Sequence, residues 1–299
     1  MYPILIIIVG SFLIPGLIGR TRSILSGRKG PGILQPLYNL ILLTKKGSVI
    51  GKESSFVQLF GPVLVFSSTL TAALFVPIAG MPGLISFDYD FVMFAYLIAL
   101  SRFWIIISAM DTGSSFEGMG ASREAFYGLL LEPAFFIFLG SFALLTGNST
   151  FASLINSPDN AGLSYYFAAM LGMYILFSSL QIENSRMPYD DPKTHLELTM
   201  IHEVMLLDLS GIDLALIQLS NFLKFGIYSS LIAGCILPSS IPIYFIFLFA
   251  LLIQMATGIS IGFIESFQAR NRLNKNPQFI LALTAVALVI LMIAMLLIK

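Results

Sequence analysis

Ionisable side chains gather in one stretch of this 299-residue chain, ENSRMPYDDPKTHLELTMIHEVMLLD, residues 183–208. It holds six of the sixteen acidic residues and both histidines: Glu183, Asp190, Asp191, Glu197, Glu203, Asp208, His195 and His202. Carboxylates that share a cavity raise one another's pKa, and a raised pKa suits groups that exchange protons near neutral pH. The stretch therefore predicts coupled proton sites, and a solvated loop with ordinary helix caps is the alternative.

The sequence around these groups also predicts a local helix. Asp-Asp-Pro at residues 190–192 offers a helix N-cap followed by proline at the first helical position. We therefore expect residues 193–208 to form a short helix that ends before Ser210. It is too short and too polar to cross a membrane, which predicts a cytoplasmic or interfacial element. His195 and His202 are interpreted as structural or hydrogen-bonding residues.

Two further charges lie inside apolar runs, Arg102 in ALSRFWII and Glu132 in GLLLEPAFF. An ionisable group in the bilayer costs about 2.5–3.5 kcal/mol on insertion scales, which suggests a functional role. Pro133 follows Glu132 and predicts a local helix break that faces water or protein, with Arg102 as the counter-ion. Glu183 and Glu265 end other apolar runs, and Glu265 could equally be a boundary residue that reaches for the membrane surface.

The rest of the chain is strongly apolar. Hydrophobic residues make up 57% and charged residues 11%, with a mean hydropathy of +0.90, whereas soluble domains contain about 25% charged residues. We therefore predict an all-α, polytopic membrane protein with a single transmembrane domain over residues 1–299. About eight helices are expected from runs of sufficient length. They cover residues 2–18, 62–78, 91–109, 128–146, 163–182, 219–237, 242–264 and 278–298.

Charge placement predicts the orientation. Fourteen of the sixteen Lys and Arg residues, including Lys224, are assigned to one side of the membrane, the side on which four loops lie. The exceptions are Arg102 and Lys299. These loops cover about residues 19–60, 110–127, 183–218 and 265–277. By the positive-inside rule they are cytoplasmic, so both termini face the other side. A multi-pass protein of the cell inner (plasma) membrane is expected, with its first run retained because it lacks a signal cleavage site.

The first loop has a motif of its own, GRKGPGILQPLYNLILLTKKG. Arg28 and Lys29 precede a Gly-Pro-Gly turn at residues 30–32, and Pro36 falls in the first turn of a predicted helix. Its apolar residues are Ile33, Leu34, Leu37, Leu40 and Ile41. The pattern predicts an amphipathic helix on the inner membrane surface, and a generic lipid anchor is the alternative.

Several chemistries are excluded by missing residues. An iron–sulfur cluster usually needs four thiolates, and the chain has one cysteine, Cys235. Both histidines lie outside the predicted spans, so no haem ligand pair is available there. His202 begins an HExxH-like sequence, but Leu206 stands where the second histidine is required. No metal site is predicted. The formal net charge of zero gives no basis for a nucleic-acid partner, and electron transfer must belong to other subunits.

Four motifs carry a resemblance to a known family: RKGPGILQPL, DTGSSFEGMGASREAFYGLLLEP, ENSRMPYDDP and FIESFQARNRL. The chain resembles the eight-helix membrane subunit shared by respiratory complex I (the NADH dehydrogenase subunit 1 type) and the energy-converting membrane-bound nickel-iron hydrogenases. The family's Arg-to-Glu spacing falls on Arg123 and Glu132. Departures from the complex I pattern are Ser185, Lys193 and His195, whereas Glu197 matches. The similarity is stronger to the hydrogenase and formate hydrogenlyase branch.

The resemblance implies a membrane-anchoring and coupling subunit that links electron transfer in soluble subunits to proton translocation. The chain would be a non-redox subunit of an oxidoreductase, with no catalytic centre and no bound cofactor of its own. Implied partners are the lipid membrane, a cluster-bearing small subunit, a hydrogenase-like large subunit and antiporter-like membrane subunits. Iron–sulfur clusters and a nickel–iron centre would belong to those partners.

Site residues follow from the same resemblance. The implied proton path comprises Glu132, Glu183, Asp190, Glu197, Glu203, Asp208 and Glu265. Its supporting charges are Arg102, Arg123 and Arg186. The implied partner interface comprises Arg28, Lys29, Gly30, Pro31 and Gln35.

Two other functions stay open. The chain could form the quinone chamber of an NADH-quinone oxidoreductase, which would need an apolar tunnel near the turn at residues 28–35. A stand-alone ion transporter could use Arg102, Glu132 and Glu265. Transporters often show repeated halves with broken helices, and the sequence contains no strong internal repeat.

Overall fold

Among the residues that the structure describes, eight helices are long and apolar enough to cross a membrane, which confirms the predicted number and order. The computed structural model describes residues 2–49, 51, 54–155, 163–191, 200–238 and 241–297. The long helices are α1 (Tyr2–Leu25), α3 (Phe56–Phe75), α4 (Asp90–Asp111), α5 (Ser115–Thr146), α7 (Leu163–Glu183), α8 (Gly211–Ile236), α9 (Ile243–Phe267) and α10 (Asn276–Leu297). Shorter elements are α2 (Gln35–Thr44), α6 (Phe151–Ile155) and the 3-10 helices Glu203–Leu206 and Leu273–Lys275.

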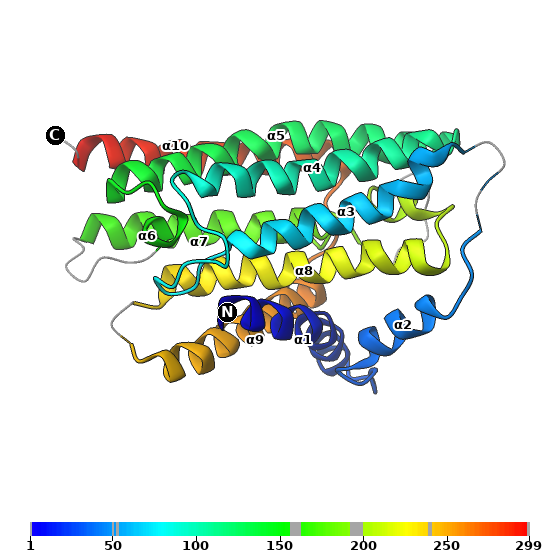
Figure 1. The fold of residues 1–299 in the computed structure, drawn as a ribbon, viewed down its shortest axis with the longest axis horizontal. Coiled ribbons are helices and arrows are strands. Elements are labelled where there is room, and N and C mark those ends of the chain that lie inside the picture. The colour runs from blue at the N-terminus through cyan, green and yellow to red at the C-terminus, as the bar shows by residue number, and fades with distance from the viewer. Residues whose placement is uncertain are drawn as a thin grey trace.

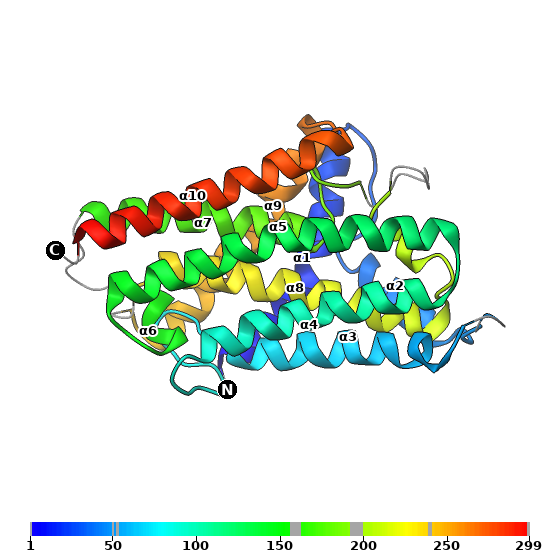
Figure 2. The ribbon, with the colours of Figure 1, turned by 90° about the horizontal axis from the view of Figure 1, so that it is seen from above.

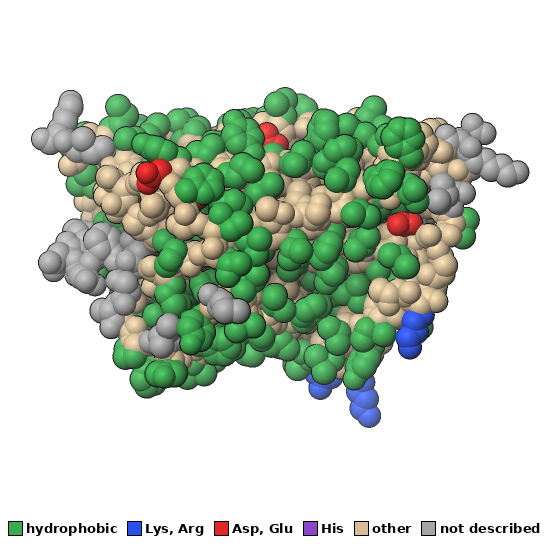
Figure 3. Space-filling view, in the orientation of Figure 1, with side chains coloured by type: hydrophobic (Ala, Val, Ile, Leu, Met, Phe, Trp, Pro, Cys, Tyr) green, Lys and Arg blue, Asp and Glu red, His purple; other side chains and the backbone are tan. Residues whose placement is uncertain are grey.

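Most of the long helices run side by side, and α1 crosses them at a steep angle (Figures 1 and 2). Helix α8 lies at the centre, in contact with α1, α3, α7 and α9. Of its most apolar segment 83% is buried, whereas the other spans reach at most 50%. Hydrophobic side chains cover most of the face in Figure 3, as expected of a lipid-facing surface.

Small and hydroxyl side chains let other helices approach α8 closely. A Cβ at Gly226 would lie 2.2 Å from Ser11 Oγ and 2.4 Å from the Ile7 carbonyl oxygen of α1, so only glycine fits there. On the α3 side, Thr69 and Ser220 share a hydrogen bond of 2.7 Å. Such small and polar contacts hold membrane helices together where apolar burial cannot, because lipid is as apolar as a leucine side chain. These close contacts hold α8 at the centre of the bundle, where the charged groups lie around it.

Helices α3, α5 and α8 begin six, thirteen and eight residues earlier than predicted. Helix α5 starts at Ser115 and not at residue 128, because polar residues in its first turns hide a continuous helix. It also runs unbroken through Pro133, so the predicted break is wrong. Its 32 residues span about 48 Å at about 1.5 Å per residue, longer than the hydrocarbon core of about 30 Å. One end of α5 therefore extends beyond the membrane.

Helix α8 starts at Gly211 and not at residue 219. A separate correction concerns Lys224, which the charge pattern groups with the cytoplasmic loops although it falls inside the predicted span 219–237. Lys224 lies inside α8 and is 6% exposed. The apolar residues on both sides of it extend the helix past the charge, so a buried cation stands in the middle of the bundle.

The segment between α7 and α8 also differs from expectation. The predicted helix over residues 193–208 falls partly outside the described residues, and the described part contains only the 3-10 helix Glu203–Leu206. Backbone N–H groups of Ile201 and His202 bind the Asp190 carboxylate, which holds this backbone out of an α-helical ladder.

The first loop contains the predicted helix, α2, with Pro36 in its first turn. Leu40 is its buried residue, and Tyr38, Ile41 and Leu42 are exposed. Its amphipathic placement on the membrane surface stays a prediction. Lys and Arg side chains gather near α2 in Figure 3. The C-terminal end of the chain lies at the opposite end of the bundle (Figure 1).

Candidate functional site

Glu183, at the end of α7, lies between two cations inside the bundle. Its Oε1 accepts a hydrogen bond from Arg102 Nη2 of α4, and its Oε2 lies 3.0 Å from Lys224 Nζ of α8. The three residues are 5%, 5% and 6% exposed. Burying a carboxylate is tolerable only when its charge and lone pairs are matched. Both oxygens of Glu183 are therefore compensated by a full positive charge.

Arg102 extends this contact to two carboxylates of α5. Its Nη1 lies 3.5 Å from Glu132 Oε1, and its Nε lies 3.5 Å from Glu124 Oε1. Glu124 and Glu132 are eight residues apart, just over two turns, so both lie on one face of α5. Gly128 stands between them, and a Cβ there would lie 2.8 Å from Arg102 Cδ. The glycine makes room for the guanidinium.

These five residues form the buried ion cluster: Arg102, Glu124, Glu132, Glu183 and Lys224. It contains three carboxylates and two cations, so the fully ionised cluster carries one excess negative charge. In a low-dielectric interior such an excess favours the uptake of a proton by one carboxylate. The charge balance of the cluster therefore leaves room for one additional proton.

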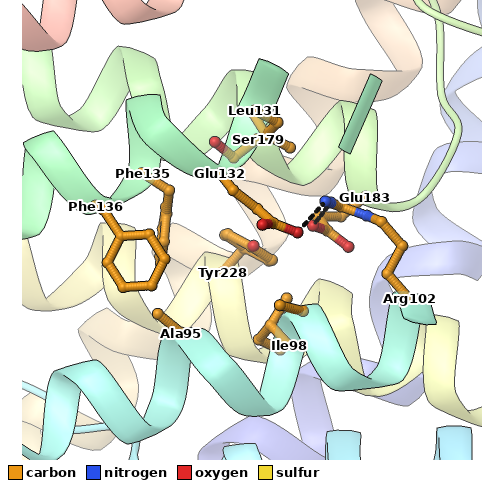
Figure 4. Close-up of a pocket in the computed structure, with 11 residues that line it drawn as sticks. Ala95, Ile98, Arg102, Leu131, Glu132, Phe135, Phe136, Ser179, Glu183 and Tyr228 are labelled. Carbon is orange, nitrogen blue, oxygen red and sulfur yellow. Dashed lines mark hydrogen bonds and ion pairs between the residues drawn. The ribbon is translucent and has the colours of Figure 1, made fainter. Parts of the chain in front are cut away.

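A small pocket, the inner pocket, adjoins the cluster on the side of Glu132. Its volume is about 20 Å³, enough for about one water molecule. Among its lining residues are Glu132, Ser179, Glu183 and Tyr228. Figure 4 shows Glu132 and Arg102 pointing toward one another across it, with Tyr228 beside them. The Glu132 side chain is 43% exposed, so this end of the cluster reaches the side of the bundle.

A second and larger space, the polar cavity, lies between α1, α2, α8 and the segment that follows α7. Its volume is about 410 Å³, and its polar lining includes Asn39, Asn184, Arg186, His202, Asn221 and Glu265. Within the described ranges, Asn184 Oδ1 and Arg186 Nε are buried without a hydrogen-bond partner. Buried polar atoms are satisfied by water or a polar ligand when no protein group reaches them. The lining therefore fits a hydrated space.

Glu265, at the end of α9, lies on the wall of the polar cavity. Its Oε1 is 3.4 Å from Arg186 Nη1 and its Oε2 is 3.6 Å from Arg22 Nη1. Arg186 also lies over the Phe225 ring, 5.2 Å from the centroid. Glu265 is 5% exposed, so its carboxylate faces protein charges and does not extend into solvent as a boundary residue would.

Asp190 has a different environment. It is 1% exposed, Arg270 Nη2 lies 2.9 Å from its Oδ1, and backbone N–H groups of Asp191, Ile201 and His202 donate to its two oxygens. Burial raises the pKa of Asp190, against the lowering effect of Arg270 and the backbone donors. The contacts make Asp190 a clamp on the loop backbone.

His202 lines the polar cavity next to the cluster. Its Nε2 lies 3.1 Å from Asn221 Nδ2, an amide group that can only donate. Burial and the positive charge of Lys224 lower the pKa of His202 to about 4, although Glu183 acts in the opposite direction. The ring is neutral near neutral pH and accepts from Asn221, in line with the hydrogen-bonding role expected of it.

The remaining predicted residues lie outside the cluster. Arg123 donates to the Met200 carbonyl oxygen at 2.9 Å, which ties α5 to the loop. Asp208 is exposed, and its backbone N–H donates to Glu117. Glu203 is a half-buried residue on the cavity wall. His195 and Glu197 fall outside the described residues. In the first loop Arg28 and Lys29 are exposed, Gly30 accepts from Arg20 at 3.4 Å, and Pro31 and Gln35 line the polar cavity.

Sequence reasoning missed Glu124, Lys224, Arg22 and Arg270. The sequence could have identified Glu124, because it lies about two helical turns before Glu132 and therefore on the same helix face. It could have identified Lys224 too, because this residue interrupts an apolar run of span length. Among the residues that the structure describes, no three His, Cys, Asp or Glu side chains are grouped to hold a metal ion.

Comparisons with known proteins bear on the whole chain. The NADH dehydrogenase family model matches residues 1–296. Hydrogenase-4 component C of Escherichia coli is 31% identical over 226 residues, which cover 76% of this chain and 70% of that protein. Formate hydrogenlyase subunit 4 of the same organism is 28% identical over 241 residues, 80% of this chain and 78% of that one.

A quinone-linked relative and a solved structure match as well. An NADH-quinone oxidoreductase subunit of Rubrobacter xylanophilus is 26% identical over 208 residues, 68% of this chain and 61% of that protein. A chain of the membrane-bound sulfane sulfur reductase, an archaeal respiratory membrane complex, shares the fold with a TM-score of 0.82, 18% identity and 98% coverage of both chains. The chain is thus a multi-pass membrane protein of the NADH dehydrogenase family, whose relatives are membrane subunits of hydrogenase and quinone oxidoreductase complexes.

Proposed function

We propose that this chain is the membrane-anchoring and coupling subunit of a hydrogenase-type complex, and that it links electron transfer in soluble subunits to proton translocation. The observation that carries the proposal is the position of Glu183, which belongs to the buried ion cluster and is followed directly by residues 184–186 on the wall of the polar cavity. The chain itself performs no redox step. Its work is to hold and pass protons.

Polar contacts run from the polar cavity into the bundle. Asn221 and His202 line the cavity, and Lys224 lies one turn after Asn221 on α8. Lys224 contacts Glu183, and Arg102 joins Glu183 to Glu132. The series ends at the exposed side of Glu132, where a neighbouring membrane subunit would receive the proton.

Electrostatics gives this series a means of coupling. At an effective dielectric constant of about 20, a unit charge about 4 Å away contributes about 4 kcal/mol, or about 3 pKa units. A charge that appeared about 4 Å from Glu183 would therefore change its proton affinity about a thousandfold, and a charge further away in the polar cavity would act less strongly. No large helix movement is required.

The partners in this proposal are a cluster-bearing small subunit, a hydrogenase-like large subunit and antiporter-like membrane subunits. Iron–sulfur clusters and a nickel–iron centre would belong to the soluble partners. The two hydrogenase-complex relatives, at 31% and 28% identity, favour this branch over the quinone branch at 26%.

A quinone chamber is the second candidate, because the polar cavity lies beside Pro31 and Gln35, where such a chamber was expected. Its lining is mixed. The apolar walls that a quinone tail needs are supplied by Pro15, Ile18, Phe222 and Phe225. Arg22, Arg186 and Glu265 place charges on the same wall.

Purification of the tagged chain from its own membranes in mild detergent tests the proposal. We expect cluster-bearing soluble subunits and further membrane subunits to copurify, and the isolated complex to evolve or oxidise hydrogen. Quinone reduction without hydrogen chemistry would establish the second candidate instead. A chain that purifies alone and transports ions in liposomes would contradict both.

A further inference from the structure

The Glu183–Lys224 ion pair lies at the boundary between the two spaces. On the α7 side, Glu183 lines the inner pocket, and residues 184–186 line the polar cavity. On α8, Asn221 lines the polar cavity and Tyr228 lines the inner pocket. Phe225 also lines the polar cavity, so the change on α8 falls between Phe225 and Tyr228. Lys224 precedes this point by one residue, lines neither space itself, and contacts Glu183 at 3.0 Å. Both chain segments therefore pass from one space to the other next to this ion pair.

The two cations on Glu183 differ in their chemistry. An arginine guanidinium stays protonated in proteins, whereas a buried lysine ammonium can release its proton. Arg102 therefore supplies a fixed charge. Lys224 is 6% exposed and has a single acceptor contact, with Glu183. It is the cation of the cluster that is able to exchange a proton.

Several charged and titratable groups surround the ion pair. Glu183 of α7 contacts Lys224, and Arg102 of α4 contacts the other oxygen of Glu183. Lys224 also acts electrostatically on Glu124 of α5 and His202 of the loop. The fixed charge of Arg102 disfavours a second positive charge beside it, and the carboxylates favour one. Lys224 therefore has neighbours of both signs around its ion pair with Glu183.

We propose that Lys224 is the proton gate between the polar cavity and the inner pocket. The Lys224 ammonium transfers a proton to the Glu183 carboxylate, which leaves a neutral amine and a neutral carboxyl group. Glu183 passes that proton through a water molecule in the inner pocket to the Glu132 carboxylate. Lys224 then takes a proton from water in the polar cavity. Each transfer breaks one bond to hydrogen and forms another, and one proton has moved from cavity to pocket.

Arg102 gives this sequence a direction. Its Nη1 contacts Glu132 and its Nη2 contacts Glu183, so both carboxylates are held beside the same water-sized space. Its charge favours ionised Glu183 and therefore discourages the proton from staying there. Glu132, with its longer contact and more exposed side chain, is the better place for the proton to leave the bundle.

The gate rests on the proposed coupling function, and two variants of the intact complex test it. Lys224→Arg retains the positive charge but cannot release a proton. Lys224→His can release one, at lower pH. We expect the arginine variant to assemble and to lose at least tenfold in proton translocation per turnover, measured with a pH-sensitive dye in proteoliposomes. The histidine variant should retain translocation with its pH profile displaced toward acid. Lys45→Arg at the exposed end of α2 is the matched control and should behave as the parent.

The outcomes separate the gate from the function on which it rests. Full translocation in Lys224→Arg would show that Lys224 only balances charge, and would overturn the gate. Loss in both variants with assembly intact would also overturn it, as would failure of both to assemble, which would assign Lys224 to folding. A parent complex that evolves hydrogen without moving protons would contradict the coupling function itself.

Discussion

Arg270 binds Asp190 with 2.9 Å between Nη2 and Oδ1, which joins the segment after α9 to the segment after α7. A second tie runs alongside it, since the Asn271 N–H donates to the Pro188 carbonyl oxygen at 2.9 Å. A third is the hydrogen bond of 3.1 Å from Asn276 Nδ2 to the Tyr189 carbonyl oxygen. Residues 188–190 of the acidic stretch are therefore fixed to the rest of the bundle.

The first prediction concerns this clamp. Asp190→Ala leaves the Arg270 guanidinium and the Ile201 and His202 N–H groups without their acceptor. Removing one partner of a buried charge pair costs about 3–5 kcal/mol. We expect lower thermal stability of the purified complex and faster protease cleavage between residues 190 and 208. Asp191→Ala is the control with a smaller expected loss. Normal stability in Asp190→Ala would reassign Asp190 to a role other than a clamp.

The second prediction concerns pH and His202. The pKa of His202 is lowered from 6.5 to about 4, so the folded protein binds this proton less readily than the unfolded chain. Its stabilising effect is fully present above pH 6.5 and is lost as the pH falls toward 4. About 2.5 pKa units correspond to roughly 3 kcal/mol. Thermal unfolding between pH 7 and pH 4 should show this loss, and His202→Gln should reduce the slope. An unchanged slope would mean that other groups dominate.

The third prediction concerns Glu132. Glu132→Gln retains the shape of the side chain and removes its ability to titrate. We expect hydrogen turnover and proton translocation to fall together, because a coupled complex cannot turn over freely when a proton step is blocked. Assembly should survive, since a neutral amide is easier to bury than a charge. Quantifying the copurified subunits checks that point. Normal turnover and translocation would remove Glu132 from the path.

The fourth prediction concerns the balance around Glu183. Glu183→Gln leaves Arg102 and Lys224 as facing cations without the carboxylate between them. We expect poor assembly of the complex, because uncompensated buried charges are strongly destabilising. The double variant Glu183→Gln with Lys224→Met removes one charge of each sign, so assembly should return while proton translocation stays lost. The measured quantities are complex yield and translocation. A double variant that translocates normally would exclude both residues from the proton path.

The fifth prediction concerns the first loop. Arg28 and Lys29 are exposed at the turn before α2. If they brace the soluble arm, Arg28→Ala and Lys29→Ala should release part of the hydrogenase-like subunit from the membrane fraction, and more so at higher salt because exposed charges are screened. Lys46→Ala at the far end of α2 is the comparison. Equal membrane retention in all three variants would favour a generic lipid anchor.

Hydropathy was sufficient to predict the number and order of the spans, because each apolar run is long enough to cross the hydrocarbon core of a membrane. It could not predict the start of α5, because Glu117, Arg123 and Glu124 in its first turns have the composition of a loop. Their side chains find partners elsewhere in the fold, and this is what allows a polar segment to stay helical. The residue pattern within one segment does not reveal these tertiary partners, so it could not predict that the segment is helical.

The site was predictable in part for a related reason. Glu183, Glu132 and Arg102 stand out as charges within or beside apolar runs, and the structure brings all three together. Lys224 falls inside the predicted span 219–237, but the charge count groups it with the loops, so its place in the bundle was overlooked. The surroundings of Asp190 could not be predicted, since its donors come from residues 191, 201, 202 and 270, which only tertiary folding assembles.

Helix α5 carries Arg123, which holds the loop at Met200, and Glu132, nine residues further on. Because the helix is unbroken between them, these two points are parts of one stiff rod, about 13.5 Å apart at about 1.5 Å per residue. A movement of the loop that displaces Arg123 would therefore also displace Glu132, because both residues belong to the same rigid helix. One inserted residue between them would turn Glu132 by about 100° around the axis, away from Arg102. The number of residues along α5 therefore sets the angle about the helix axis between the Arg123 contact at Met200 and the Glu132 carboxylate beside Arg102.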